Sequence, residues 1–131
     1  MWMLDTNICI YVIKRKPERV FERLRKLDPS DVCVSSITLA ELEYGVTRSS
    51  RPAQNAEALT ALLAPLGVAP FDERAAAAYG GVRARLERAG TLIGSLDMLI
   101  AAHALSLGRV LVTHNLREFE RVDGLHAESW V

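Results

Sequence analysis

Two patterns of hydrophobic and polar positions alternate along this chain: short apolar runs, and longer stretches with helical spacing. The apolar runs predict β-strands over residues 2–5, 31–35, 68–71 and 110–113, with a weaker strand over residues 126–130. The longer stretches predict α-helices over residues 7–14, 17–27, 37–49, 52–66, 72–89 and 95–107. Strands that alternate with helices are typical of parallel β–α–β construction. We therefore predict a three-layer α/β/α domain with a short, mainly parallel central sheet.

Proline and glycine residues support several of these helix boundaries. Pro17 and Pro52 suit the first turn of a helix, where a missing backbone N–H breaks no hydrogen bond. Gly90 and Gly108 directly follow two predicted helices, as C-terminal caps do. The helix over residues 95–107 is apolar on almost every side, so we expect it to lie centrally against the sheet.

Length and composition indicate an ordinary globular protein. The chain has 131 residues, and we predict one domain over residues 1–131. No apolar stretch reaches the roughly 18 residues of a membrane span, and the N-terminus lacks the pattern of a signal peptide. We therefore expect a cytoplasmic protein with no membrane partner. Cys9 and Cys33 lie within apolar runs, which favours buried reduced thiols over a disulfide.

The formal net charge is zero, which argues against a protein that simply coats nucleic acid. Basic side chains nevertheless crowd one early segment: Lys14, Arg15, Lys16, Arg19, Arg23, Arg25 and Lys26. This segment is either a solvated helix face or a local phosphate-binding rim, and the sequence leaves both interpretations open.

Three acidic residues stand where a solvated helix face explains them poorly. Asp5 ends the first predicted strand, where open α/β sheets bind ligands, although an acid there can also cap the following helix. Glu41 shares an apolar helix face with Ile37 and Tyr44, so it needs a polar partner or a route to solvent. Asp97 lies in the first turn of the apolar helix, a position that also complements the helix dipole.

Three inward carboxylates on different elements would repel one another, and a divalent cation is the usual solution. Ligation by oxygen alone indicates Mg²⁺ or Mn²⁺. His103, His114 and His126 are too scattered for a zinc site, and we interpret each as structural or exposed. Asn115 follows the fourth predicted strand, where it could be a turn residue or could supply a carbonyl oxygen. Glu118 lies just beyond it.

Four motifs occur in a familiar order along the chain: "MLDTN", "SSITLAELEYG", "GSLDMLIAAHA" and "LVTHNLREFERVDGL". Together they resemble the PIN-domain ribonucleases, and more narrowly the VapC toxins of toxin–antitoxin pairs. The resemblance implies a PIN-like fold and a Mg²⁺- or Mn²⁺-dependent endoribonuclease. It implies that Asp5 and Asp97 are metal ligands and that Glu41 completes the acidic cluster, directly or through water. The family often has an acid where Asn115 stands, and Glu118 is near enough to substitute as a metal ligand.

The resemblance also implies partners. VapC toxins commonly form homodimers, are neutralised by a VapB-type antitoxin, and stop translation by cutting a structured RNA such as a tRNA anticodon loop or an rRNA loop. Phosphodiester hydrolysis needs a nucleophilic water and charge stabilisation at the phosphate. The candidate catalytic residues are Asp5, Glu41, Asp97 and Asn115, with Glu41 as the candidate general base. The candidate substrate-binding residues are Lys14, Arg15, Lys16 and Arg48.

Two other functions remain open from the residues alone. One is a catalytically inactive PIN-like module that binds RNA or protein, which Asn115 favours and the three retained acids oppose. The other is an aspartyl-phosphate phosphohydrolase, because "LDTN" follows a strand, but that class needs a second Asp where Asn7 stands. Tyr44 and Trp2 are expected to pack inside the protein rather than to stack on RNA bases.

Overall fold

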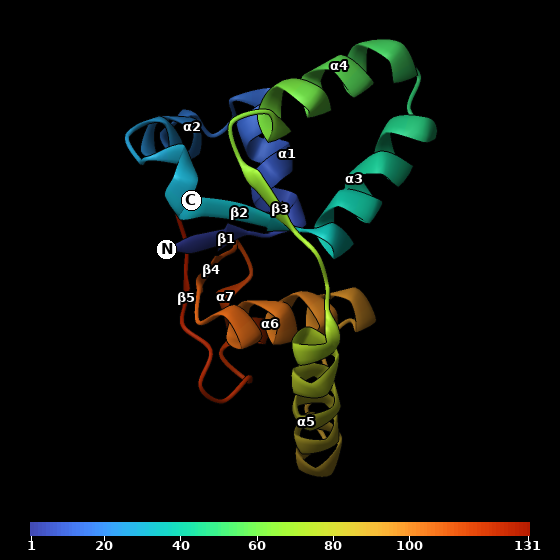
Figure 1. Cartoon of the computed structure of the whole chain (residues 1–131), viewed down its shortest axis with the longest axis vertical. Coiled ribbons are helices and arrows are strands. Elements are labelled where there is room, and N and C mark those ends of the chain that lie inside the picture. The colour runs from blue at the N-terminus through green and yellow to red at the C-terminus, as the bar shows by residue number, and fades with distance from the viewer.

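The computed structural model describes all 131 residues, with a five-stranded sheet between two layers of helices (Figure 1). The strands are β1 (Trp2–Leu4), β2 (Val32–Ser35), β3 (Gly67–Ala69), β4 (Val110–Val112) and β5 (Ala127–Glu128). The helices are α1 (Thr6–Lys14), α2 (Glu18–Arg25), α3 (Ser36–Thr47), α4 (Pro52–Leu63), α5 (Glu73–Ala89), α6 (Ser95–Leu107) and α7 (Leu116–Phe119). A 3₁₀ turn, η1 (Pro29–Asp31), precedes β2.

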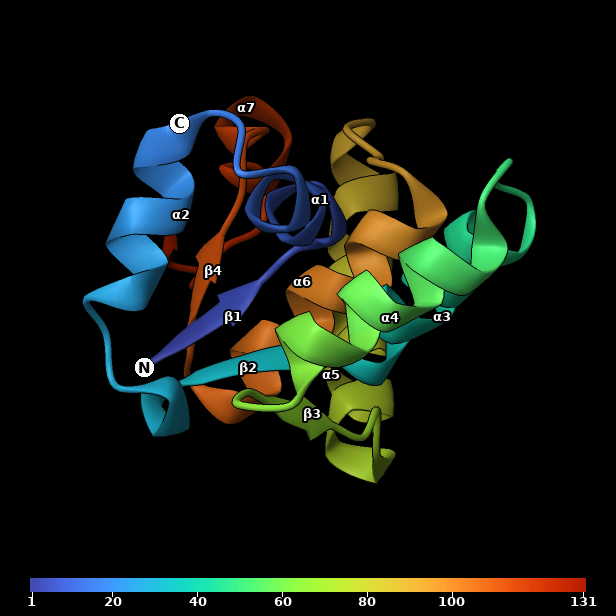
Figure 2. The same cartoon turned by 90° about the horizontal axis from the view of Figure 1, so that it is seen from above.

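All strand pairs of the sheet are parallel, and the strand order is β3-β2-β1-β4-β5. The predicted fold class is therefore confirmed, with a sheet that is parallel throughout. β1 lies between β2 and β4 (Figure 2), so the chain moves outward on one side of β1 and then returns to build the other side. Ligand sites of open parallel sheets lie at such a reversal, outside the carboxyl ends of the strands. Asp5 lies at this reversal, because it directly follows β1 and its backbone N–H donates to the Val112 carbonyl of β4 at 3.0 Å.

Alternate residues of the strands fill two separate hydrophobic cores. Leu4, Val34 and Val112 belong to the core under α1, α2, α3 and α4, on one face of the sheet (Figure 1). Met3 and Leu111 belong to the core under α5, α6 and α7, on the other face. This division follows from the pleat of a strand, which directs successive side chains to opposite faces. The three-layer architecture is thus a consequence of apolar residues at successive positions of the central strands, as in β1 and β4.

Several predicted boundaries are confirmed. Gly90 and Gly108 cap the C-terminal ends of α5 and α6 with φ values of 67° and 64°, which glycine adopts without a Cβ clash. Pro52 occupies the first turn of α4. Cys9 and Cys33 are both free and buried, as predicted, and they lie in different cores.

Other boundaries differ from the prediction. Pro17 has an extended backbone (ψ 144°) and precedes α2 instead of lying in its first turn. α4 ends at Leu63, because Pro65 has no backbone N–H to continue the helix. The short helix α7 was not predicted, since its four residues are too few to show a helical period. None of the helices combines the length and the apolar character that a membrane crossing requires.

Candidate active site

Asp5 lies directly after β1 and caps the N-terminus of α1. Its Oδ1 accepts a hydrogen bond from the backbone N–H of Ile8 at 3.0 Å, and only 6% of the residue is exposed. Burial raises the pKa of Asp5, and the charge of Glu41 raises it further, whereas hydrogen bonds from Thr113 and from the Ile8 N–H lower it. The capping role is therefore real, and it leaves the second carboxylate oxygen of Asp5 outside that bond.

Glu41 lies on α3 and receives a short hydrogen bond from α1. The Thr6 hydroxyl donates to Oε1 of Glu41 at 2.6 Å and also lies 3.4 Å from the hydroxyl of buried Thr38. Sequence reasoning missed Thr6, although it directly follows Asp5 in "MLDTN". The expectation that Tyr44 packs inside the protein is wrong, because 68% of this residue is exposed. The face of α3 that carries Glu41 is therefore the wall of a groove rather than part of the core.

Asp97 lies half-buried in the first turn of α6. Burial raises the pKa of Asp97 to about 6, and the charges of Glu118, Asp5 and Glu41, in that order, contribute to the rise. Three acids from distant parts of the chain therefore act on Asp97, and we refer to Asp5, Glu41, Asp97 and Glu118 as the acidic cluster. The sequence predicted this convergence for Asp5, Glu41 and Asp97. It named Glu118 as the acid that could substitute for the one that the family often has at the position of Asn115.

Glycine at position 94 makes room for one of these carboxylates. A Cβ built on Gly94 would lie 3.1 Å from Oδ2 of Asp97, closer than most real contacts of a Cβ. Gly94 precedes α6, and its carbonyl accepts from the backbone N–H of Met98 at 2.9 Å. The loop before α6 thus leaves room for the Asp97 carboxylate in its observed position.

Asn115 lies beyond the carboxyl end of β4, at the edge of the sheet where Asp5 follows β1. The residue is exposed, its backbone N–H donates to the Thr113 hydroxyl at 2.9 Å, and its side chain makes no capping bond to α7. Thr113, which is fully buried, thus supports both Asp5 and the turn that carries Asn115. Sequence reasoning missed Thr113, whose signal was its position as the residue after β4.

The acidic cluster contains oxygen donors only, and its mutual repulsion is visible in the raised pKa of Asp97. A hard divalent cation suits such a donor set. In the side-chain positions that the structure shows, however, no three Asp, Glu, His or Cys residues are arranged to hold a metal ion together. The donor chemistry and the charge therefore fit Mg²⁺ or Mn²⁺, and binding requires the carboxylates to turn toward a common point.

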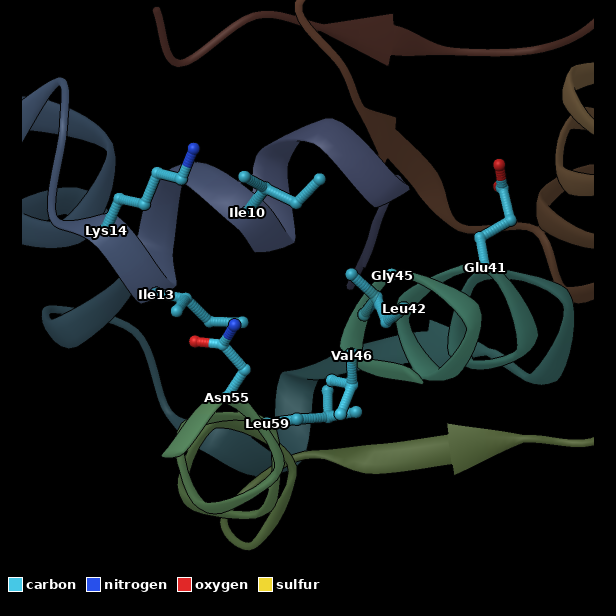
Figure 3. A pocket seen from close by; sticks show the side chains of 9 residues that line it. All are labelled: Ile10, Ile13, Lys14, Glu41, Leu42, Gly45, Val46, Asn55 and Leu59. Carbon is cyan, nitrogen blue, oxygen red and sulfur yellow. The ribbon is translucent and has the colours of Figure 1, made fainter. Parts of the chain in front are cut away.

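The predicted substrate-binding cations have different surroundings. Lys14 lines a hollow of about 240 Å³ between α1, α3 and α4, and Figure 3 shows it at the opposite end from Glu41. Arg48 lines a neighbouring hollow of about 590 Å³ that also includes Glu41. Arg15 instead stacks over Phe21, with its guanidinium carbon 4.4 Å from the ring centroid. Lys16 is exposed and makes no ion pair.

None of the histidines forms a metal-binding group with the acidic cluster, although the charge of His114 lowers the pKa of Asp5. His103 is buried, and its Nδ1 lies 2.8 Å from the hydroxyl of Ser35, which caps α3. His114 is exposed and contacts the edge of Tyr11, with ring centroids 5.9 Å apart. His103 therefore stabilises the start of the helix that carries Glu41, in agreement with its interpretation as structural.

The chain is similar to known proteins over almost its whole length. Residues 2–125 match the sequence profile of the PIN domain family. The tRNA(fMet)-specific endonuclease VapC of Salmonella typhimurium is 48% identical over 129 residues, which cover 98% of this chain and 97% of the relative. Ribonuclease VapC2 of Haemophilus influenzae is 47% identical, with 99% of this chain and 98% of the relative covered.

Solved structures agree with this similarity. The structure superposes on DNA-bound VapBC from Salmonella typhimurium with a TM-score of 0.94 and 48% identity, covering 99% of this chain and 98% of that one. It superposes on VapBC2 from Rickettsia felis, bound to a promoter DNA fragment, with a TM-score of 0.93 and 39% identity, at the same coverage of both chains.

Proposed function

The chain belongs to the PIN-domain family, and we propose that it is a VapC-type endoribonuclease, the toxin of a toxin–antitoxin pair. Relatives named as VapC ribonucleases match it over nearly their full length, and both solved structures described above are VapBC complexes. A VapB-type antitoxin is accordingly the protein that neutralises it. The observation that carries the proposal is the acidic cluster at the carboxyl ends of β1 and β4, where the charges of three other acids reach Asp97.

We propose that Asp5, Asp97 and Glu41 hold Mg²⁺ or Mn²⁺, Glu41 directly or through water, with Glu118 as a further ligand. The oxygen-only donor set and the crowded negative charge support this assignment. When bound, such an ion neutralises charge that develops on a phosphodiester and makes water a better nucleophile. Homodimer formation, expected from the family resemblance, belongs to the same proposal.

The chain's own residues have separable tasks in this proposal. Burial and the Ile8 N–H hold Asp5 in one orientation. The Thr6 hydroxyl orients Glu41, which is placed to take a proton from the attacking water as the general base. Asn115, exposed at the same edge, orients a water or a phosphate oxygen through its amide.

Cationic residues offset the repulsion between the acidic cluster and RNA. Lys14 and Arg48 line hollows that include Glu41, which supports contacts between these cations and phosphates near the cut. Arg15 contributes less, because its guanidinium packs on Phe21. The proposed substrate is a structured RNA, a tRNA anticodon loop or an rRNA loop. Initiator tRNA is the first to test, since one relative is named for it.

The test is cleavage of initiator tRNA and of total cellular RNA by antitoxin-free protein, with Mg²⁺, with Mn²⁺ and with EDTA. We expect a discrete cut, mapped by end sequencing, that EDTA and Asp97→Asn each abolish. Glu43→Gln is the matched control, because Glu43 is an exposed acid on α3 outside the acidic cluster. Folded wild-type protein that cuts no RNA with either metal would contradict the proposal and favour a catalytically inactive PIN-like module that binds RNA or protein.

Metal binding has a readout that does not depend on cleavage. A ligand that binds only the folded state stabilises it by about 2.7 kcal/mol at one hundred times its dissociation constant. We expect Mg²⁺ or Mn²⁺ to raise the unfolding temperature of the wild-type protein and of Glu43→Gln, but not that of Asp97→Asn. An equal rise in all three proteins would place the metal away from Asp97.

A further inference from the structure

Tyr44 presents an exposed aromatic ring beside the acidic cluster. It lies on α3, three residues beyond Glu41, and its 68% exposure is the highest among the large hydrophobic residues of the chain. Leu96, on α6 and next to Asp97, is 45% exposed and lines the same hollow as Tyr44. Two large apolar side chains from different helices thus face one hollow instead of the core.

This hollow has the size and the lining of a ligand site. Its volume of about 590 Å³ lies within the range of roughly 300–1,000 Å³ that is usual for small-molecule pockets. Polar groups of Thr6, Asn7 and Arg48 line it together with the apolar ones. Glu41 lines it as well, so the hollow shares one residue with the acidic cluster.

Gly45 keeps part of this hollow empty. It lies one turn beyond Glu41 on α3 and lines both this hollow and the smaller one that contains Lys14. A Cβ added to Gly45 would meet no atom within 4 Å. A Cβ at this position would therefore displace no existing group, and a longer side chain would extend from a residue that lines the hollow.

Arg48 adds a positive charge to the aromatic wall. Its guanidinium carbon lies 5.6 Å from the centroid of the Tyr44 ring, within the range of a cation–π contact. Exposed aromatic rings next to cations are what proteins use to hold unpaired nucleotides, because every base has a face to stack and every nucleotide carries a phosphate. An apolar peptide would use neither the guanidinium nor the Asn7 amide.

We propose that this hollow is a nucleobase subsite: Tyr44 stacks on the base next to the cleaved phosphodiester, and Arg48 contacts the phosphate beyond it. The inference rests on the proposed ribonuclease function, because Glu41 joins the subsite to the acidic cluster. The Asn7 amide can donate to and accept from a base edge, so it is the side chain in this hollow suited to distinguish one base from another. Tyr44 and Asn7 are therefore specificity-determining residues for the sequence at the cut.

The test combines a protein change with an RNA change. Short RNAs that carry the mapped cut are prepared with normal nucleotides, or with an abasic nucleotide on one side of the cut or on the other. For the wild-type protein, we expect one of the two abasic positions to lower kcat/KM by roughly 5- to 100-fold, as expected for a lost base–aromatic stack. Tyr44→Leu should show a similar loss on the normal RNA and almost no further loss on the abasic one.

Three further variants sharpen this experiment. Tyr44→Phe retains the ring and should cleave within about twofold of wild type. Gly45→Leu should behave like Tyr44→Leu, because its side chain fills the hollow. Tyr79→Leu is the matched control, since Tyr79 also has an arginine four residues later, Arg83, but lies on α5 outside this hollow. It should leave the abasic effect unchanged, and urea unfolding would verify that each variant is folded.

An abasic penalty that is the same in wild type and Tyr44→Leu would overturn the subsite while leaving the ribonuclease function intact. So would a Tyr44→Leu variant that cleaves normally but escapes inhibition by the antitoxin, which would identify the hollow as a protein-docking site. Absence of any cut by wild-type protein would instead contradict the proposed function itself.

Discussion

Substitution of Asp97 by asparagine is expected to make the metal-free protein more stable while abolishing cleavage. The charge of Asp97 is unfavourable in the folded state, because burial, followed by the charges of Glu118, Asp5 and Glu41, raises its pKa from 3.8 to about 6. Asparagine has nearly the same shape and no charge. Asp97→Asn therefore removes repulsion in the same step that removes a proposed metal ligand.

The magnitude follows from the pKa difference between the folded and unfolded states. A rise from 3.8 to about 6 corresponds to a ceiling of about 3 kcal/mol at 1.36 kcal/mol per pKa unit. The side chain is only half-buried, so solvent screening reduces the expected effect to about 1–2 kcal/mol. The folded state binds the Asp97 proton more tightly than the unfolded state does. The free energy of unfolding of the wild-type protein therefore falls by this amount as the pH rises from about 4 to 6. The gain of Asp97→Asn should accordingly be full at pH 8 and mostly absent at pH 4.

The assay is urea unfolding at pH 4 and pH 8 in EDTA, followed by tryptophan fluorescence. Asp123→Asn is the control, because Asp123 is exposed and pairs only with Arg85, at 3.6 Å. It should show no comparable gain at pH 8. Mg²⁺ should reverse the order of wild type and Asp97→Asn, because it should stabilise the wild-type protein but not this variant. A variant that is less stable than wild type at both pH values would refute the electrostatic reasoning, since it would mean that the Asp97 carboxylate makes net favourable contacts.

Three further predictions concern groups that support the site or the fold. Thr6→Val removes the hydroxyl that donates to Glu41 at 2.6 Å, and steady-state cleavage should show kcat falling about tenfold with KM little changed. Gly94→Ala places a Cβ 3.1 Å from Oδ2 of Asp97, so kcat should fall about tenfold while urea unfolding stays near wild type; normal cleavage would show that the carboxylate shifts freely. Glu128→Ala leaves two indole N–H groups without their shared acceptor, and the free energy of unfolding should fall by about 1–3 kcal/mol with cleavage unchanged.

The layered fold was predictable because local patterns of apolar residues indicate which faces of the strands and helices are buried. Apolar residues at every position of a short strand require cover on both faces, and the two cores of the structure provide that cover. The apolar helix α6 was correctly placed against the sheet for the same reason. A helix of four residues, barely one turn, is too short to show a repeating pattern, which is why α7 was missed.

The acids of the site could be named from the sequence, because a charge on an apolar face or at a strand end is conspicuous. Their supporting groups could not, because a threonine is common in strands and helices alike. Thr6 and Thr113 reach Glu41 and Asp5 only because the fold brings α1 beside α3 and β1 beside β4. The exposure of Tyr44 could not be predicted for the same reason. Helical spacing placed Tyr44 on an apolar stripe, but it could not show whether another element covers that stripe.

The sequence by itself determined most of the helices and strands, the mainly parallel sheet, and the candidate acids Asp5, Glu41 and Asp97, because these depend on the order of apolar and polar residues along the chain. Only the tertiary structure decided that Glu118 joins the acidic cluster, that Arg15 packs on Phe21, and that Tyr44 faces an open hollow. Those outcomes depend on contacts between helices distant in sequence, and whether a side chain faces a neighbour or a gap is a property of the assembled layers alone.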